Sequence, residues 1–120
     1  MTDFHAIAER YLAAWNHGDD ASRASLLEKG WAAQAQYTDP LMSASNRDEV
    51  ATMISAARSQ FPGHAFSLRG NVDGHANFVR FSWTLAPEQG APVAGGSDVI
   101  RLNAAGDIVE VIGFLDEGVA

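Results

Sequence analysis

The chain has 120 residues, 47% apolar and 19% charged, which is enough for one domain with its own core and argues against disorder. The net charge of −7, with Lys29 as the single lysine, argues against a nucleic-acid-binding surface. No apolar run approaches the roughly 18 residues of a membrane span, and the absence of cysteine excludes disulfides and thiolate metal ligands. The first ten residues lack the basic and apolar stretches of a signal peptide, so we expect a cytoplasmic protein.

The N-terminal segment predicts a helix over residues 3–17. Thr2 or Asp3 is a suitable N-cap, and Gly18 follows at the C-terminal end, where glycine is the preferred residue. The apolar residues recur at three- and four-residue spacing, which places them on one helix face. They are Phe4, Ile7, Ala8, Tyr11, Leu12 and Trp15.

Two further helices are predicted before the strands begin. The second covers 21–35, is bent or broken near Gly30, and leads into a short strand over 35–38. The third opens at "SNRDEV" and runs to about Gln60, where "FPG" stops it because the residue before a proline disfavours the helical conformation. One face of the third helix carries Val50, Met53, Ile54 and Ala57.

The rest of the chain predicts antiparallel strands. Segments 64–72 and 75–85 flank the dipeptide Asp73–Gly74, which is a strong hairpin signal. "PEQGAP" supplies the next turn, and "AGD" joins a last hairpin made of 95–104 and 107–115. Helices followed by a meander predict a single α+β domain over residues 1–120, with helices packed on one face of a curved antiparallel sheet.

Strand alternation assigns the sheet faces, since residues two apart share a side. The larger and more apolar face of the middle strand is expected to meet the helices, and it carries His75, Asn77, Val79, Phe81, Trp83 and Leu85. The next strand adds Asp98, Ile100 and Leu102 to one face. The last strand is apolar on both faces, so we expect a homodimer formed through the outer face of the sheet.

Two aspartates stand out because each carries a carboxylate into apolar surroundings. Asp98 lies on the strand face predicted to be inward, where a carboxylate must be paired, hydrogen-bonded or protonated. Asp39 precedes Pro40 in "YTDP", and it either caps a turn or faces a pocket. A backbone amide or Arg101 could instead satisfy Asp98. Two aspartates beside one apolar cavity could acquire divergent pKa values, one serving as a base and the other as a protonated donor.

Several segments together resemble the SnoaL-like and ketosteroid-isomerase-like branch of the nuclear transport factor 2 superfamily. They are "RYLAAWNHGDD", "AQYTDPLM", "NRDEVATMI" and "GSDVIRLNAAGDIVEVIGFLD", and the resemblance covers nearly the whole chain. It implies a cone in which three helices close a strongly bent antiparallel sheet around a deep apolar pocket. Members of this superfamily include isomerases, cyclases, dehydratases and non-catalytic transport or assembly domains.

The resemblance also implies catalytic roles, by matching positions with the ketosteroid isomerases. Asp39 would be the general base, while Tyr11 and a protonated Asp98 would donate hydrogen bonds to the enolate oxygen. Those enzymes carry a supporting tyrosine where this chain has Ile54, and the segment between Tyr11 and Asp39 is longer here. Together with the strand faces, the resemblance gives the ligand-binding residues as Trp15, Met53, His75, Asn77, Phe81, Trp83, Leu85, Val111, Gly113 and Leu115.

Three hypotheses for function follow. The first is a cofactor-independent enzyme that moves a proton on a small, apolar carbonyl compound, as an isomerase, cyclase or dehydratase does. The second is a module that binds a small apolar molecule without turnover, and the third is a dimerisation or scaffold domain whose cone is filled by aromatic side chains. We favour the first. His5, His17 and His64 lack metal-ligand spacing, so no metal site and no cofactor is expected.

Overall fold

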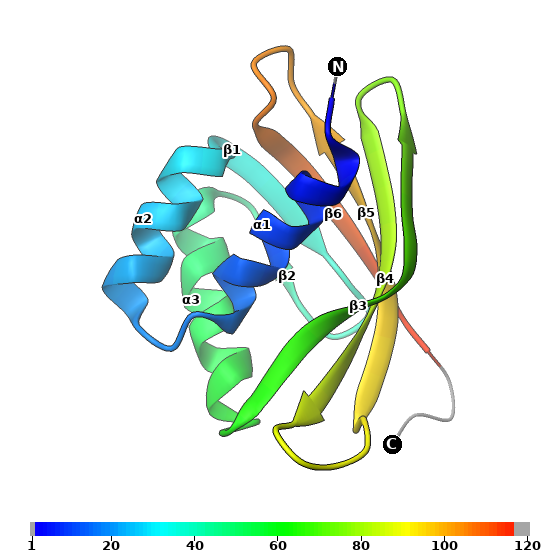
Figure 1. The fold of residues 1–120 in the computed structure, drawn as a ribbon. Coiled ribbons are helices and arrows are strands. Elements are labelled where there is room, and N and C mark those ends of the chain that lie inside the picture. Colours follow the sequence, from blue (N-terminus) through cyan, green and yellow to red (C-terminus); the bar gives the residue numbers. More distant parts are fainter. Residues whose placement is uncertain (1, 117–120) are drawn as a thin grey trace.

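The computed structural model describes residues 2–116 of the chain. Three helices gather on one side of a curved six-stranded sheet (Figure 1). The helices are α1 (Phe4–Asn16), α2 (Asp20–Gly30) and α3 (Arg47–Ser59). The strands are β1 (Trp31–Thr38), β2 (Ser43–Ala44), β3 (His64–His75), β4 (Phe78–Pro87), β5 (Ala94–Leu102) and β6 (Ile108–Leu115). Within residues 2–116, no helix is long and apolar enough to cross a membrane.

The sheet confirms the α+β class but is mixed rather than purely antiparallel. Its strand order is β2-β1-β6-β5-β4-β3, and β1 runs parallel to β6, with Tyr37 opposite Val111. The alternation of side chains along a strand does not encode the direction of its neighbour, so the prediction was wrong for this pair. The β3–β4 register shifts between Arg69 and Asp73, where Gly70 takes a φ of 72°. Such a shift bends the strand and contributes to the curvature of the sheet.

Each helix begins at a side chain that caps its first turn. Asp3 accepts a hydrogen bond from the N–H of Ala6, and Asn46 accepts one from the N–H of Glu49, which confirms the predicted starts of the first and third helices. The second helix is capped in the same way by Asp19. These carboxylate and amide oxygens satisfy N–H groups that have no partner within the helix.

The second helix ends five residues earlier than predicted. It stops at Gly30, and residues 31–35, predicted as helical, belong to β1. The alanine- and glutamine-rich composition of this segment favours a helix locally. Trp31 instead pairs with Ile108 of β6, and both side chains are buried, so tertiary pairing overrides the local preference.

The first hairpin turns at Ala76 and Asn77 rather than at the predicted Asp73–Gly74. His75 pairs with Phe78, and Ala76 takes a left-handed φ of 52°. Gly74 stays inside β3, where an added Cβ would lie 2.6 Å from the backbone oxygen of Phe78 and 2.7 Å from Cδ1 of Phe4. The glycine therefore allows the close approach of β4 and of α1, which is why the hairpin signal misplaced the turn.

The inner face of the sheet is the one that the helices cover. As predicted, it buries Val79, Phe81, Trp83, Leu85, Ile100 and Leu102. Val111 is fully buried beside them. On the outer face Ile112 is 41% exposed and Phe114 58% exposed. This apolar outer surface agrees with the sequence pattern, while the homodimer that it suggested stays a prediction.

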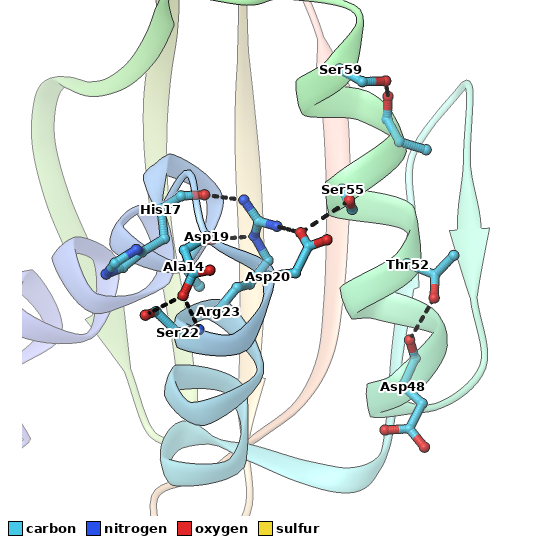
Figure 2. Close-up of polar contacts among 11 residues, drawn as sticks. Ala14, His17, Asp19, Asp20, Ser22, Arg23, Asp48, Thr52, Ser55 and Ser59 are labelled. Atoms are coloured by element: carbon cyan, nitrogen blue, oxygen red, sulfur yellow. Dashed lines mark hydrogen bonds and ion pairs between the residues drawn. The ribbon is translucent and has the colours of Figure 1, made fainter.

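Arg23 is a buried cation that joins the first two helices (Figure 2). Its side chain donates to the carbonyl oxygens of Ala14 and His17 at the end of α1 and to the carboxylate of Asp20. The carbonyls at a helix end lack partners within the helix, so this guanidinium acts as a C-terminal cap from outside α1. Ser55 of α3 donates to the same Asp20 carboxylate at 3.1 Å, which extends the contact to the third helix.

Arg23→Ala should destabilise the protein by about 2–4 kcal/mol, because it orphans two carbonyl oxygens and leaves a cavity. Urea unfolding at neutral pH measures this loss. Ser55→Ala, which removes an exposed bond of the same cluster, is the matched control and should change stability by less than about 0.5 kcal/mol. Equal losses of unfolding free energy for the two substitutions would show that Arg23 does not stabilise the contact between α1 and α2 more than Ser55 does.

The predicted homodimer has a separate test on the outer face. If this face forms the interface, analytical ultracentrifugation should give the mass of two chains for the wild type and of one chain for Ile112→Lys, since a buried unpaired ammonium disfavours association. Ser59→Lys, exposed on α3, is the control and should not change the mass. A wild-type protein with the mass of one chain would contradict the prediction.

Candidate functional site

A cavity of about 150 Å³ lies between the helices and the inner face of the sheet. Its apolar wall consists of Leu12, Trp15, Leu41, Met42, Ala57, Phe61, Phe66, Trp83, Leu85, Ala94 and Leu115. Its polar wall consists of Tyr11, Tyr37, Asp39, Arg58 and Asp98. Binding pockets for small molecules usually have this composition, a mostly apolar wall with a few polar groups that fix the orientation of the ligand.

Asp98 of β5 is 3% exposed and is held by two donors from other elements. The hydroxyl of Tyr11 donates to Oδ2 at 2.8 Å, and Nε1 of Trp83 donates to Oδ1 at 3.2 Å. Burial raises the pKa of Asp98 from 3.8 to about 6; the two hydrogen bonds lower it, and the nearby charge of Asp39 adds a smaller increase. Desolvation thus outweighs hydrogen bonding, and Asp98 changes its protonation state close to neutral pH.

Tyr11 reaches Asp98 from α1 and is fixed by aromatic neighbours. Its ring stacks on Trp31 with centroids 5.9 Å apart and meets Phe81 edge-on at 5.4 Å. Burial raises the pKa of Tyr11 well above its usual range, the negative charge of Asp98 raises it further, and the nearby Trp15 opposes the rise. The hydroxyl therefore keeps its proton and acts as a donor.

Asp39 sits at the end of β1 and combines the two roles weighed for it. Its Oδ1 accepts hydrogen bonds from the backbone N–H groups of Leu41 and Met42, each at 2.8 Å, so it does cap a turn. Its Oδ2 accepts the hydroxyl of Tyr37 at 2.6 Å, and the side chain also lines the cavity. The pKa of Tyr37 is raised by burial and by the charges of Asp98 and Asp39, so this hydroxyl is also a donor.

The two carboxylate–tyrosine pairs meet over Gly113 of β6. A Cβ at this position would lie 3.0 Å from Oδ1 of Asp98, 3.2 Å from Cβ of Asp39 and 3.5 Å from the hydroxyl of Tyr37. A larger residue would therefore push into both pairs. Glycine thus leaves the room in which two carboxylates with different partners lie near each other.

The structure brings together seven of the residues singled out from the sequence. Tyr11, Trp15, Asp39, Trp83, Leu85, Asp98 and Leu115 all line the cavity. Their catalytic and ligand-binding roles stay predictions. Two-residue alternation along β4 correctly placed the Trp83 and Leu85 side chains on the inner face of the sheet, which is the face that the cavity adjoins.

The other six predicted ligand-binding residues lie outside the lining, for three different reasons. Phe81 packs behind Tyr11, and Met53 and Val111 are buried in the core. Gly113 backs the two carboxylates without forming part of the wall. Because the hairpin turns later than expected, His75 is exposed at the end of β3 and Asn77 lies in the turn, where its amide donates to the carbonyl of Leu102.

Two polar residues of the cavity wall, Tyr37 and Arg58, were not predicted from the sequence. Tyr37 lies two residues before Asp39, so both fall on the same side of the chain, and this spacing could have revealed the pair. Arg58 lies four residues after Ile54, which places it on the inward face of α3. The aromatic residues Phe61 and Phe66, from the α3–β3 connection and from β3, carried no comparable signal.

Asp98→Asn tests the burial of the carboxylate through the pH dependence of stability. In the wild type the raised pKa means that the folded protein holds the proton more tightly than the unfolded chain, so stability falls as the pH rises through the window from 3.8 to about 6. Relative to the variant, the wild type should lose up to about 3 kcal/mol between about pH 4 and pH 7. Urea unfolding across this range measures the difference, and parallel curves for the two proteins would contradict the assignment.

Comparisons with known proteins agree with this fold. The sequence profile of the SnoaL-like domain matches residues 8–111. A solved structure from Agrobacterium tumefaciens strain C58, a proposed isomerase of the SnoaL-like family, is 50% identical and has a TM-score of 0.93 over 97% of this chain and 99% of that chain. No curated protein sequence matches the chain.

Two solved structures of low identity match in fold alone. A proposed polyketide cyclase from Sinorhizobium meliloti is 13% identical, with a TM-score of 0.69 over 90% of this chain and 93% of that chain. An NTF2-like protein of unknown function from Cytophaga hutchinsonii is 10% identical, with a TM-score of 0.71 over 97% of this chain and 92% of that chain. With its helices on one side of a curved sheet and a profile match over most of its length, the chain belongs to the SnoaL-like domain family and has the NTF2-like cone fold.

Proposed function

We propose that this domain catalyses proton transfer on a small, mostly apolar carbonyl compound, as an isomerase, cyclase or dehydratase does, without a cofactor. The observation that carries the proposal is the meeting of the Tyr11–Asp98 and Tyr37–Asp39 pairs over Gly113, in an apolar cavity. The names of the Agrobacterium and Sinorhizobium proteins, a proposed isomerase and a proposed polyketide cyclase, support the same class of chemistry.

In this proposal Asp39 is the general base. Its Oδ2, held by the hydroxyl of Tyr37 at 2.6 Å, takes the proton from the carbon beside the substrate carbonyl. The electrons of the broken C–H bond form the enolate double bond, and the negative charge moves to the oxygen. Return of the proton to another carbon completes an isomerisation, whereas loss of a β-hydroxide completes a dehydration.

Asp98 and Tyr11 are the proposed donors to the developing oxyanion. Because burial raises the pKa of Asp98 to about 6, protonating it at neutral pH costs about 1 kcal/mol, compared with about 4 kcal/mol for an ordinary aspartate. A negative oxygen arriving beside this carboxyl raises its pKa further, so the protonated form becomes the favoured one as charge develops. Asp98 then donates to the same oxygen as the Tyr11 hydroxyl.

Binding without turnover is the second candidate, and one observation favours it. Both carboxylates already accept hydrogen bonds from protein groups on each of their oxygens. A ligand oxygen must therefore displace or share a bond before either carboxylate can act. The scaffold hypothesis fits less well, since a cone filled by aromatic side chains leaves no room for a cavity of about 150 Å³.

Isomerisation of a β,γ-unsaturated cyclohexenone to its conjugated isomer separates the two candidates, because it requires removal and return of a proton beside a carbonyl. The rate is followed by the absorbance of the conjugated product. Asp39→Asn should lower the rate by about 100-fold or more, as expected when a general base is removed. Asp48→Asn, an exposed aspartate on α3, is the control and should leave the rate unchanged.

The contrary result would be wild-type protein that binds the cyclohexenone and leaves its isomerisation at the rate in buffer. That outcome would favour the binding module. Equal rates for the wild type and Asp39→Asn would remove Asp39 from the role of base.

A further inference from the structure

Arg58 brings a positive charge to a cavity that is otherwise apolar or acidic. It lies in the last turn of α3 and is the one cation in the cavity wall formed by residues 2–116. Its Nη1 is buried, and no group within residues 2–116 accepts a hydrogen bond from it. Buried donors in folded proteins nearly always have partners, and those that lack one point to an unseen ligand or water.

The surroundings of Arg58 hold the guanidinium in place without neutralising it. Its central carbon lies 5.9 Å from the centroid of the Phe66 ring, within range of a cation–π contact. Burial lowers the pKa of Arg58, and the positive charge of Arg23 lowers it further. Arg23 already has Asp20 as its own partner at 2.8 Å, so no charge is left there for Arg58. Arg58 therefore lies near a second cation, and no carboxylate within residues 2–116 pairs with Arg58, so its guanidinium favours an incoming anion.

The two carboxylates of the cavity form hydrogen bonds with groups other than Arg58. Asp39 bonds Tyr37 and the turn at Leu41 and Met42, while Asp98 bonds Tyr11 and Trp83. Within residues 2–116 neither of them forms an ion pair with Arg58. The cavity thus has two chemically different places: a carboxylate–tyrosine region that could handle a carbonyl oxygen, and a guanidinium that lacks its anion.

We propose that Arg58 binds a carboxylate group of the substrate, which makes the substrate a small oxo acid with an apolar ring or chain between its carbonyl and its carboxylate. Aromatic and aliphatic wall residues such as Trp15, Phe66 and Leu85 hold the apolar middle. The inference rests on the proposed function in using the same cavity, and it adds the class of substrate. A guanidinium matches the geometry of a carboxylate with paired N–H donors.

A phosphate would meet the same guanidinium, but the cavity argues against it. A dianion would enter a mostly apolar space that already holds Asp39 and Asp98, so its desolvation and repulsion would both be larger than for a single carboxylate. The substrate carboxylate is therefore the better match for one cation. Leu41 and Phe61, which are 76% and 39% exposed, form an exposed apolar part of the cavity wall that suits an amphipathic acid.

Binding of three phenolic probes tests the inference, since a phenol imitates an enolate oxygen at the carboxylate–tyrosine region. The probes are para-cresol, para-hydroxyphenylacetamide and para-hydroxyphenylacetate, and calorimetry gives the Kd of each. The acid should bind the wild type at least about tenfold more tightly than the amide, as a charge-assisted hydrogen bond predicts. Arg58→Gln should abolish this preference, so that the acid and the amide bind the variant with the same Kd.

Arg10→Gln is the matched control, because it removes the same charge from an exposed position on α1 and should keep the preference. A wild type that does not prefer the acid, or a preference that survives Arg58→Gln, would overturn the inference, as would the failure of all three probes to bind. The cyclohexenone assay reads the proposed function separately, since that ketone carries no carboxylate. Isomerisation without an Arg58-dependent preference for the acid would support the proposed function and overturn the inference. An Arg58-dependent preference without isomerisation would overturn the proposed function and leave Arg58 as a group that binds carboxylates.

Discussion

The Asp98 carboxylate is buried on the inner face of the sheet, so the surrounding elements must supply hydrogen-bond donors to it. At 3% exposure it loses most of its hydration, and within residues 2–116 the hydrogen bonds from Tyr11 and Trp83 offset the loss. Tyr11 comes from α1 and Trp83 from β4, so one carboxylate ties the helical layer to two neighbouring strands. The aromatic packing of Tyr11 against Trp31 and Phe81 then fixes the hydroxyl that the carboxylate needs.

The hydrogen bonds to Asp98 offset its desolvation only in part, and this balance sets the pKa of the carboxyl group. A fully stabilised carboxylate would have a low pKa and remain ionised, and a fully desolvated one would remain protonated. Two hydrogen bonds against strong desolvation leave the pKa of Asp98 near 6, between these extremes. Asp39, which is bonded by two backbone N–H groups and Tyr37, occupies a more polar environment. The same residue type is thus placed in two different environments across Gly113.

Much of the fold could be predicted because local rules governed it. Capping side chains such as Asp3 and Asn46 marked helix starts, and two-residue alternation placed Phe81, Trp83 and Asp98 on the inner face correctly. Local rules failed where distant contacts decided the outcome. Trp31 became part of a strand through its pairing with β6, and Gly74 was needed beneath Phe4 rather than in a turn.

The membership of the site was predictable in part: Tyr11, Asp39 and Asp98 were singled out from the sequence, whereas Tyr37, Arg58 and the contacts among these residues were not. Periodicity alone cannot reveal that Tyr11 bonds Asp98 or that Arg58 lacks a partner within residues 2–116, because both depend on three-dimensional packing. Tyr11 and Asp98 are 87 positions apart, and β1 reaches its parallel neighbour β6 only after every other strand has been made. Contacts of such long range close late in folding, since the entropy of the intervening loop must be lost first. During synthesis, therefore, the helices and β1, which carry Tyr11, Tyr37 and Asp39, are made before Asp98 of β5, and the last strand, β6, completes both the sheet and the site.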